Sequence, residues 1–238
     1  IAGLAIAGAV FDMVCGAEQV TFKQLVVDGS RVQPGTRVAS VEGPTRGLLT
    51  AERTALNLLG HLSGVATATS QWADAIASTN AKVRDTRKTT PGMRALEKYA
   101  VRCGGCSNHR YSLGEHVMIK DNHVVAAGSI RKAVAAARKA APHLCRIEVE
   151  ADTLEQVDEA LAAGADVILL DNMKPVQIQK AIQRIADKAL VEISGGVTLQ
   201  NLADFALPGV DVISIGALTH SAVAADLSLD LIPRKKPR

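Results

Sequence analysis

From about residue 81 onward the sequence repeats one unit, in which a short apolar segment is followed by a longer amphipathic segment. The apolar segments are rich in Val, Ile and Leu, which is typical of strands that are buried on both faces. Most of the amphipathic segments place apolar residues three or four positions apart, as on one face of a helix. We therefore expect six strands, at residues 83–86, 117–119, 146–149, 167–170, 190–193 and 212–215.

Buried strands that alternate with amphipathic helices predict a parallel sheet covered on its outside by helices. Six units exceed an isolated βαβ motif, and no strand opens on the G-x-G-x-x-G loop of a dinucleotide-binding fold. The predicted fold class is therefore α/β, with a TIM-like α/β barrel. Residues with capping chemistry mark the expected helix starts, namely Ser129, Thr153 with Gln156, Pro175 and Thr198.

The residues before the repeat predict a smaller α/β unit. Residues 1–11 are apolar but too few to span a bilayer, so we expect a buried helix there. Short strands are expected at residues 19–22 and 38–41. The sequence does not begin with methionine, and we expect residues to be missing upstream.

A helix is expected to follow this unit, capped by Thr50 and running to about His61. Arg53 and Asn57 are four residues apart and should point the same way from this helix. We place the domain boundary between residues 49 and 50. Residues 1–49 are then the remainder of an N-terminal domain, and residues 50–238 form the barrel domain with a C-terminal tail.

The composition excludes some classes of partner and favours one compartment. A net charge of +3 and an aromatic content of 3% argue against a nucleic-acid-binding protein, which needs basic surfaces and aromatic stacking platforms. Four cysteines in 238 residues do not form the framework of a small disulfide-bonded protein. We therefore expect a reduced, cytoplasmic protein that binds small anionic substrates rather than nucleic acid or membrane.

Active sites of α/β barrels lie at the C-terminal ends of the strands. Most of the expected strand ends here carry cations or glycines. Arginine and lysine bind carboxylates and phosphates, and glycines at the start of a helix let backbone N–H groups approach a phosphate. In chain order, the candidate residues are Arg87, Lys88, His109, Arg110, Lys120, Glu150, Asp171, Ser194, Gly195, Gly216 and His220.

Glu150 and Asp171 are the two acids at strand ends within this cationic set. One interpretation is a structural pair with Lys120, because buried carboxylates need a partner. The other is that they hold Mg²⁺ through water and accept hydrogen bonds from the hydroxyls of a sugar. Together with the expected phosphate site, the second interpretation predicts a phosphorylated sugar and a second anionic substrate.

Several motifs in the chain together resemble the quinolinate phosphoribosyltransferase family. The motifs are the sequences at residues 85–92 (DTRKTTPG), 108–110 (NHR), 119–123 (IKDNH), 169–172 (LLDN), 194–196 (SGG) and 215–220 (IGALTH). The resemblance covers essentially the whole chain. It implies an N-terminal α/β sandwich domain, an incomplete α/β barrel, and homodimers, or higher oligomers, with shared active sites.

The resemblance also implies a role for each candidate residue. Quinolinate would be bound by Arg87, His109 and Arg110, with Arg53 supplied by the neighbouring subunit. Lys88 and Lys120 would face pyrophosphate and substrate, while Glu150 and Asp171 would lie around the ribose and Mg²⁺. The 5′-phosphate of phosphoribosyl pyrophosphate would be held by Ser194, Gly195, Gly216 and His220.

The implied reaction transfers phosphoribosyl to quinolinate with decarboxylation, giving nicotinate mononucleotide, pyrophosphate and CO₂ in NAD biosynthesis. Two alternatives stay open: a related transferase acting on another aromatic acid, like the paralogue associated with molybdenum uptake, and a non-catalytic phosphosugar-binding barrel. Cys103 and Cys106 form a C-x-x-C pair beside His109 and His116, where the family pattern has a glycine near position 106. Without a second C-x-x-C, we do not expect a structural zinc site there.

Overall fold

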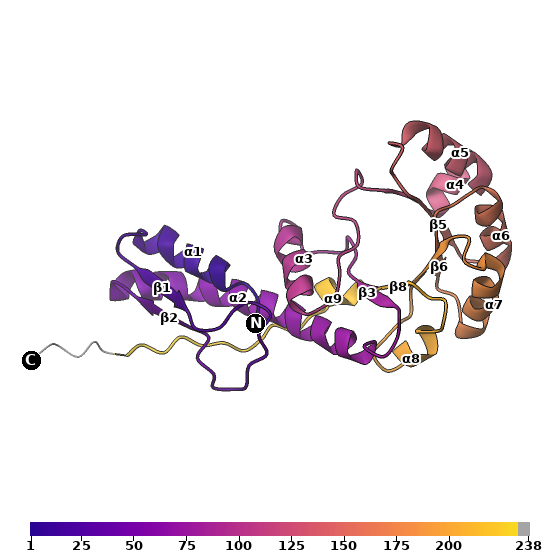
Figure 1. Ribbon diagram of the computed structural model, residues 1–238. Helices are drawn as coiled ribbons and strands as arrows, with labels where there is room; N and C mark the ends of the chain where they lie inside the picture. Colours follow the sequence, from indigo (N-terminus) through magenta and orange to yellow (C-terminus); the bar gives the residue numbers. More distant parts are fainter. Residues whose placement is uncertain (233–238) are drawn as a thin grey trace, which may run out of the picture.

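One long helix, α2 (Thr45–Ala75), connects the two parts of the molecule (Figure 1). The computed structural model describes residues 1–232. The N-terminal part consists of the helix α1 (Leu4–Cys15) and two antiparallel strands, β1 (Thr21–Gln24) and β2 (Ala39–Glu42), packed on the first half of α2. The remaining elements form the barrel at the other end of α2 (Figure 1).

Two separate apolar cores hold these parts together. The smaller core includes Leu4, Phe11 and Leu59, and Leu227 of the C-terminal tail packs against it. The tail therefore returns from the barrel to the N-terminal part, as Figure 1 shows. The larger core lies between the barrel strands and the surrounding helices, and the second half of α2 contributes Leu62 and other residues to it.

Six parallel strands form the barrel sheet, in the order β3-β8-β7-β6-β5-β4. Within the described part of the chain, the two end strands β3 and β4 do not pair with each other, so the barrel is open between them. The expected barrel fold is thus confirmed in its incomplete form. The strands are β3 (Lys82–Arg84), β4 (Val117–Ile119), β5 (Ile147–Ala151), β6 (Val167–Asp171), β7 (Leu190–Ser194) and β8 (Val212–Ser214).

Helices cover the outside of this sheet (Figure 1). Several begin where the capping residues predict: the Ser129 side chain accepts from Lys132 N, Thr153 and Gln156 form a capping box, and Pro175 opens its helix. The helices are α3 (Arg94–Cys103), α4 (Asp121–Ala127), α5 (Ile130–Ala140), α6 (Leu154–Ala162), α7 (Pro175–Ile185), α8 (Leu202–Phe205) and α9 (Ala217–His220).

Residues along the barrel strands alternate between the helix layer and the barrel interior. Ile147, Val149 and Ile193 are fully buried in the larger core under the helices. Glu148 and Glu192 lie between these residues in sequence, so their side chains point to the interior, where both are also buried. The interior of this barrel therefore contains buried charged side chains, unlike the aliphatic interior of many α/β barrels.

Two of the predicted helix starts are wrong. Thr50 does not cap α2, which begins five residues earlier; the Thr50 hydroxyl instead donates to Arg46 O within the helix. Thr198 and Asn201 bond to each other in a turn, and α8 begins only at Leu202. In both places a hydroxyl residue with local hydrogen-bonding capacity resembles a cap without being one.

Two further comparisons concern the first half of the chain. The first predicted strand is shifted by two residues, because β1 begins at Thr21. The predicted domain boundary at residues 49 and 50 falls inside α2, which continues without a break to Ala75. In the described part of the chain, no helix is both long enough and apolar enough to cross a membrane.

Candidate active site

The loops that follow the strands gather at one end of the barrel, and a buried acid anchors them. Asp85, directly after β3, is 0% exposed. Its carboxylate accepts from Lys98 Nζ of α3 (2.6 Å), from His109 N (2.7 Å) and from Asn108 Nδ2 (2.8 Å). These bonds fix the segment containing His109 and Arg110 against the end of β3, although residues of α3 separate the two in sequence.

The loop that carries Arg87 and Lys88 is held by a second buried acid. Glu97 of α3 is 0% exposed, and its carboxylate accepts from Thr90 N (3.1 Å) and contacts His61 Nε2 of α2 (2.8 Å). Arg87 and Lys88 themselves are exposed. The loop is therefore fixed at its backbone while its two cations remain accessible to a ligand.

Arg87 lies close enough to Arg110 to influence it. The pKa of Arg110 is lowered by burial and then by the charge of Arg87. The Arg110 guanidinium donates to His116 O (3.2 Å), and no carboxylate among the described residues pairs with it. Two neighbouring cations without such a partner form a site for a ligand with carboxylate groups.

His109 lies below these cations, inside the barrel, between two carboxylates. Its Nε2 is 3.2 Å from Glu192 Oε1 and 3.7 Å from Glu148 Oε2, and Ser214 donates to the same Glu192 oxygen (2.6 Å). Burial by itself lowers the pKa of His109, but hydrogen bonds to Glu148 and Glu192 outweigh it and raise the pKa. The carboxylates thus favour a proton on Nε2.

His109, His116 and Glu148 offer three ligand atoms within 4.8 Å of one another, a spacing that a metal ion can bridge. However, Nδ1 of His109 accepts from Arg110 N (2.7 Å), and this bond requires Nδ1 to be unprotonated. The ring proton then resides on Nε2, the atom that would have to bind the metal. His116 donates its own bond to Glu148 (2.9 Å). We interpret the group as a hydrogen-bonded cluster that orients His109.

Lys120 and Glu150 form an ion pair at the ends of β4 and β5. Asp171 ends β6, the next strand, and its Oδ2 accepts from Asn172 Nδ2 (2.7 Å). Because Glu150 is in register with Leu169, the two carboxylates lie on the same face of neighbouring strands, two residues out of step. Each has a second oxygen, and hard oxygen donors of this kind fit a hydrated Mg²⁺.

The ends of β7 and β8 bring the backbone close to other groups. At Gly195, with φ +86°, an added Cβ would lie 2.2 Å from Asn172 Oδ1. At Gly216, an added Cβ would lie 3.1 Å from both Lys88 Cδ and His220 Nε2. Glycine leaves the backbone at Gly195 beside the amide of Asn172 and at Gly216 beside a lysine and a histidine, which favours binding of a phosphate.

The end of the barrel where the loops that follow the strands gather is its mouth. Arg53 is the one predicted site residue that the structure does not bring to this mouth. It is exposed on the first half of α2, and its neighbours Ala51 and Ala55 pack in the smaller core of the N-terminal part. Among residues 1–232, no hydrogen bond or ion pair joins it to Arg87 or Arg110. Arg53 therefore lies on the N-terminal part of the molecule rather than among the loops at the strand ends.

Sequence reasoning missed the acids that hold the site. Asp85, Glu97, Glu148 and Glu192 are all buried at or near the mouth, and none was selected as a candidate. A signal existed for Glu148 and Glu192: Glu192 is the one acid in β7, and Glu148 alternates with apolar residues in β5, two positions before the selected Glu150. For Asp85 and Glu97 only the tertiary contacts reveal the role.

Among the described residues, Cys103 and Cys106 do not belong to the group of side chains close enough to share a metal ion. Burial raises the pKa of the Cys106 thiol to about 11, so this thiol is protonated at neutral pH. Cys106 Sγ instead contacts Thr69 O (3.7 Å). His109, which would be needed to complete a ligand set, is engaged by Glu192.

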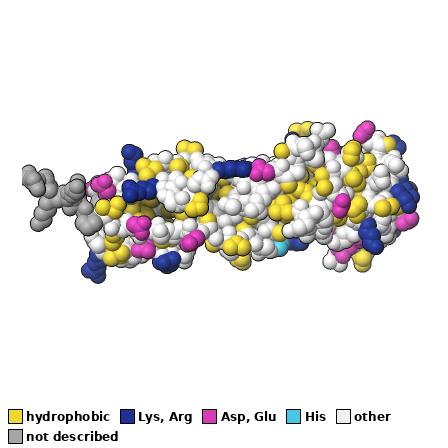
Figure 2. All heavy atoms as spheres, turned by 90° about the horizontal axis from the view of Figure 1, so that it is seen from below, with side chains coloured by type: hydrophobic (Ala, Val, Ile, Leu, Met, Phe, Trp, Pro, Cys, Tyr) yellow, Lys and Arg dark blue, Asp and Glu magenta, His cyan; other side chains and the backbone are white. Residues whose placement is uncertain are grey.

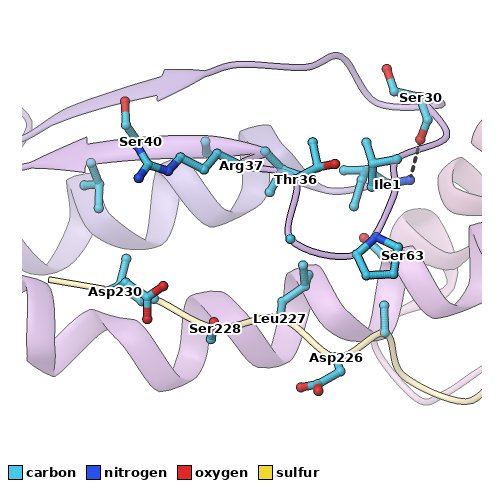
Figure 3. Close-up of a pocket in the computed structure, with 18 of the residues that line it drawn as sticks. Ile1, Ser30, Thr36, Arg37, Ser40, Ser63, Asp226, Leu227, Ser228 and Asp230 are labelled. Carbon is cyan, nitrogen blue, oxygen red and sulfur yellow. Dashed lines mark hydrogen bonds between the residues drawn. The ribbon is translucent and has the colours of Figure 1, made fainter.

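Two surface features lie outside this site. A groove of about 1800 Å³ runs between the loop that precedes β2 and the C-terminal tail (Figure 3), remote from the strand ends. Figure 3 shows Ile1 at this groove, with its amino group donating to Ser30 O (3.0 Å). On the face in Figure 2, basic and acidic side chains are interspersed rather than gathered into a patch of one sign.

The fold and the site together define an open α/β-barrel protein that binds anionic ligands at the C-terminal ends of its strands. The model of the quinolinate phosphoribosyl transferase N-terminal domain matches residues 1–63, and that of the C-terminal domain matches residues 65–230. The chain belongs to the quinolinate phosphoribosyltransferase family.

Curated relatives and solved structures agree with this assignment. The chain is 52% identical over 234 residues to the nicotinate-nucleotide pyrophosphorylase (carboxylating) of Mycobacterium leprae, covering 97% of this chain and 82% of that one. The human protein of the same name is 47% identical over 213 residues, covering 87% and 72%. The structure of NadC from Streptococcus pyogenes has a TM-score of 0.89 and 46% identity, covering 94% and 79%.

Proposed function

We propose that this chain transfers the phosphoribosyl group of phosphoribosyl pyrophosphate to quinolinate with loss of CO₂, giving nicotinate mononucleotide and pyrophosphate for NAD biosynthesis. The observation that carries the proposal is the barrel mouth, where Arg87, Lys88, Arg110 and Lys120 lie among two carboxylates and two glycine-containing turns. The names of the curated relatives support the same activity.

The two substrates call for different parts of this mouth. Quinolinate carries two carboxylates, for which the neighbouring guanidinium groups of Arg87 and Arg110 are suited. His109, with its proton directed by Glu192, adds a donor beside them. The backbone at Gly195 and Gly216, together with His220, provides donors for the 5′-phosphate. Ser194 ends β7 directly before Gly195 and belongs to the same turn.

The reaction breaks the bond between ribose C1 and the pyrophosphate oxygen and forms a bond between C1 and the pyridine nitrogen. Positive charge develops on the ribose, and the carboxylates of Glu150 and Asp171 are placed to stabilise it. Lys88 and Lys120 neutralise the departing pyrophosphate. When the carbon–carboxylate bond breaks, its electron pair stays on the ring carbon, where the adjacent cationic ring nitrogen stabilises it. CO₂ leaves, and the ring carbon takes a proton.

Three further features form part of the proposal. Mg²⁺, held by Glu150 and Asp171 through water, would supply charge neutralisation for the pyrophosphate. The active unit is a homodimer in which Arg53, exposed on the first half of α2, contributes to the partner's site. The protein functions in the cytoplasm, which is consistent with four free cysteines.

Incubation with phosphoribosyl pyrophosphate, Mg²⁺ and quinolinate tests the activity directly, with nicotinate mononucleotide and pyrophosphate as the products measured. Turnover with a different aromatic acid alone, or binding without turnover, would contradict the proposal. Lys88→Ala and Lys120→Ala should each lower turnover by roughly 100-fold or more while leaving the thermal midpoint nearly unchanged. Lys180→Ala, on the exposed face of α7, is the matched control and should keep wild-type activity.

A further inference from the structure

Arg84, the last residue of β3, points into the barrel rather than toward the helices. The residue before it, Val83, is 2% exposed and belongs to the larger core under the helix layer. Because side chains alternate along a strand, Arg84 faces the interior. Its backbone is fixed there, since Arg84 O accepts from Ile215 N (2.9 Å).

The sheet register places Arg84 in a row of polar residues across four strands. Arg84 is paired with Ser214 of β8, Ser214 with Ser194 of β7, and Ser194 with Asp171 of β6. Neighbouring residues in a parallel register point to the same side of the sheet. This row lies at the strand ends, directly beneath the turns that contain Gly195 and Gly216.

The Arg84 guanidinium has an unmet hydrogen-bonding requirement. Its Nε is buried and makes no hydrogen bond within the part of the chain that the structure describes. Nearby acids in the interior are engaged elsewhere: Glu192 accepts from Ser214 and contacts His109, and Asp171 accepts from Asn172. A buried donor without an acceptor is unfavourable unless a ligand that reaches the guanidinium supplies the missing acceptor.

We propose that Arg84 is an additional phosphate-binding residue of this mouth. The inference rests on the proposed function for the identity of the ligand, which carries phosphate at two places, the 5′-phosphate and the pyrophosphate. A guanidinium presents a planar fork that matches two phosphate oxygens. Ser214, the direct neighbour of Arg84 in the row, donates its hydroxyl proton to Glu192. Ser194, one strand further along the row, is therefore the hydroxyl available to an anion.

Titration calorimetry with ribose 5-phosphate and with inorganic pyrophosphate, each used separately, tests this role and identifies the phosphate concerned. Arg84→Ala should weaken binding of one of the two ligands by roughly tenfold to 100-fold, as expected for a charge-assisted hydrogen bond. Arg84→Lys keeps the charge but not the fork, and should show a smaller loss. Lys82→Ala, at the opposite end of the same strand and exposed, is the matched control and should bind both ligands as the wild type does.

Circular dichroism must first establish that each variant is folded. If Arg84→Ala does not fold, Arg84→Lys decides the question, and wild-type affinity of this variant for both ligands overturns the inference. Wild-type affinity of a folded Arg84→Ala also overturns it, provided that Lys88→Ala shows a loss in the same assay. If the wild type binds phosphate in an Arg84-dependent manner yet does not turn over quinolinate, the proposed function fails and this inference stands.

Discussion

Lys98 Nζ lies 2.6 Å from Asp85 Oδ1, with the two side chains 3% and 0% exposed. The same ammonium group donates to His109 O (3.0 Å), so one buried pair joins α3, the end of β3 and the segment that carries His109. Removing one member of a buried ion pair leaves the other charged and unpaired. The relationship therefore links the stability of the barrel to the geometry of its mouth.

We predict that Lys98→Met destabilises the protein by roughly 3–5 kcal/mol, because Asp85 loses its cation while remaining buried. Denaturant unfolding monitored by circular dichroism measures the change. Arg138→Ala, which breaks the exposed pair of Arg138 with Asp166, is the control and should change stability by less than about 1 kcal/mol. Equal changes in the free energy of unfolding would show that the buried Asp85–Lys98 pair stabilises the protein no more than the exposed pair does.

Glu97→Gln should disturb the anion-binding loop more than the fold. The carboxylate accepts from Thr90 N and contacts His61, and a glutamine can offer an acceptor oxygen to only one of them. We expect kcat/KM to fall about tenfold, mainly through a higher KM, because the loop that presents Arg87 and Lys88 is less well fixed. Glu155→Gln, at an exposed position, serves as the control; a folded Glu97→Gln enzyme with unchanged KM would refute the positioning role.

Acid should destabilise the protein through Glu148. Burial by itself raises the pKa of this carboxyl, but hydrogen bonds to His109 and His116 outweigh it and lower the pKa to about 2. A lowered folded-state pKa means that the stabilisation is present above the ordinary value of 4.5 and is lost as the pH falls toward about 2. The loss should be on the order of 3 kcal/mol.

Unfolding free energies measured from about pH 5 down to about pH 3 test this expectation. Glu148→Gln removes the titrating group and should flatten the pH dependence in this window. A variant that retains the full wild-type slope would assign the acid sensitivity to other carboxyls.

Mixing two impaired variants, assayed at a quinolinate concentration well below the KM of Arg53→Ala, tests whether Arg53 acts in the partner's site. Arg53→Ala should weaken quinolinate binding about tenfold to 100-fold, as expected for the loss of a charge-assisted contact. If subunits of Arg53→Ala and Lys88→Ala exchange at random, half of the dimers are mixed, and each mixed dimer has one intact site. Activity should then recover toward about a quarter of the wild-type value. Confirmed exchange without recovered activity would mean that Arg53 acts within its own chain.

The local pattern of the chain was sufficient for the barrel strands and their polar ends. Each of the six strands predicted from short runs of Val, Ile and Leu is present within a few residues of its expected bounds. The strand ends follow from the same pattern, because parallel strands place their C-terminal ends at one edge. Lys120, Glu150 and Asp171 could therefore be placed near one another before any contact was known, and the ion pair of Lys120 with Glu150 confirms one of these proximities.

Helix starts were less predictable where hydroxyl side chains had other partners. Thr50 has the chemistry of a cap, yet α2 extends through it, because the first half of that helix is buried against α1 and the smaller core. Tertiary burial of Leu48 and Ala51 outweighs the local preference of one threonine.

The sequence by itself determined the alternation of strands and helices and the row of charged and glycine residues at the strand ends, since both depend on interactions between residues close in the chain. Only the tertiary structure decided which charges are buried and what they bind. Asp85 forms an ion pair with Lys98, and Glu97 forms hydrogen bonds with Thr90 and His61. His109 contacts Glu192 across the barrel interior. A buried charge is stable only with a partner, and here that partner comes from a different element whose position is fixed by packing of the whole barrel.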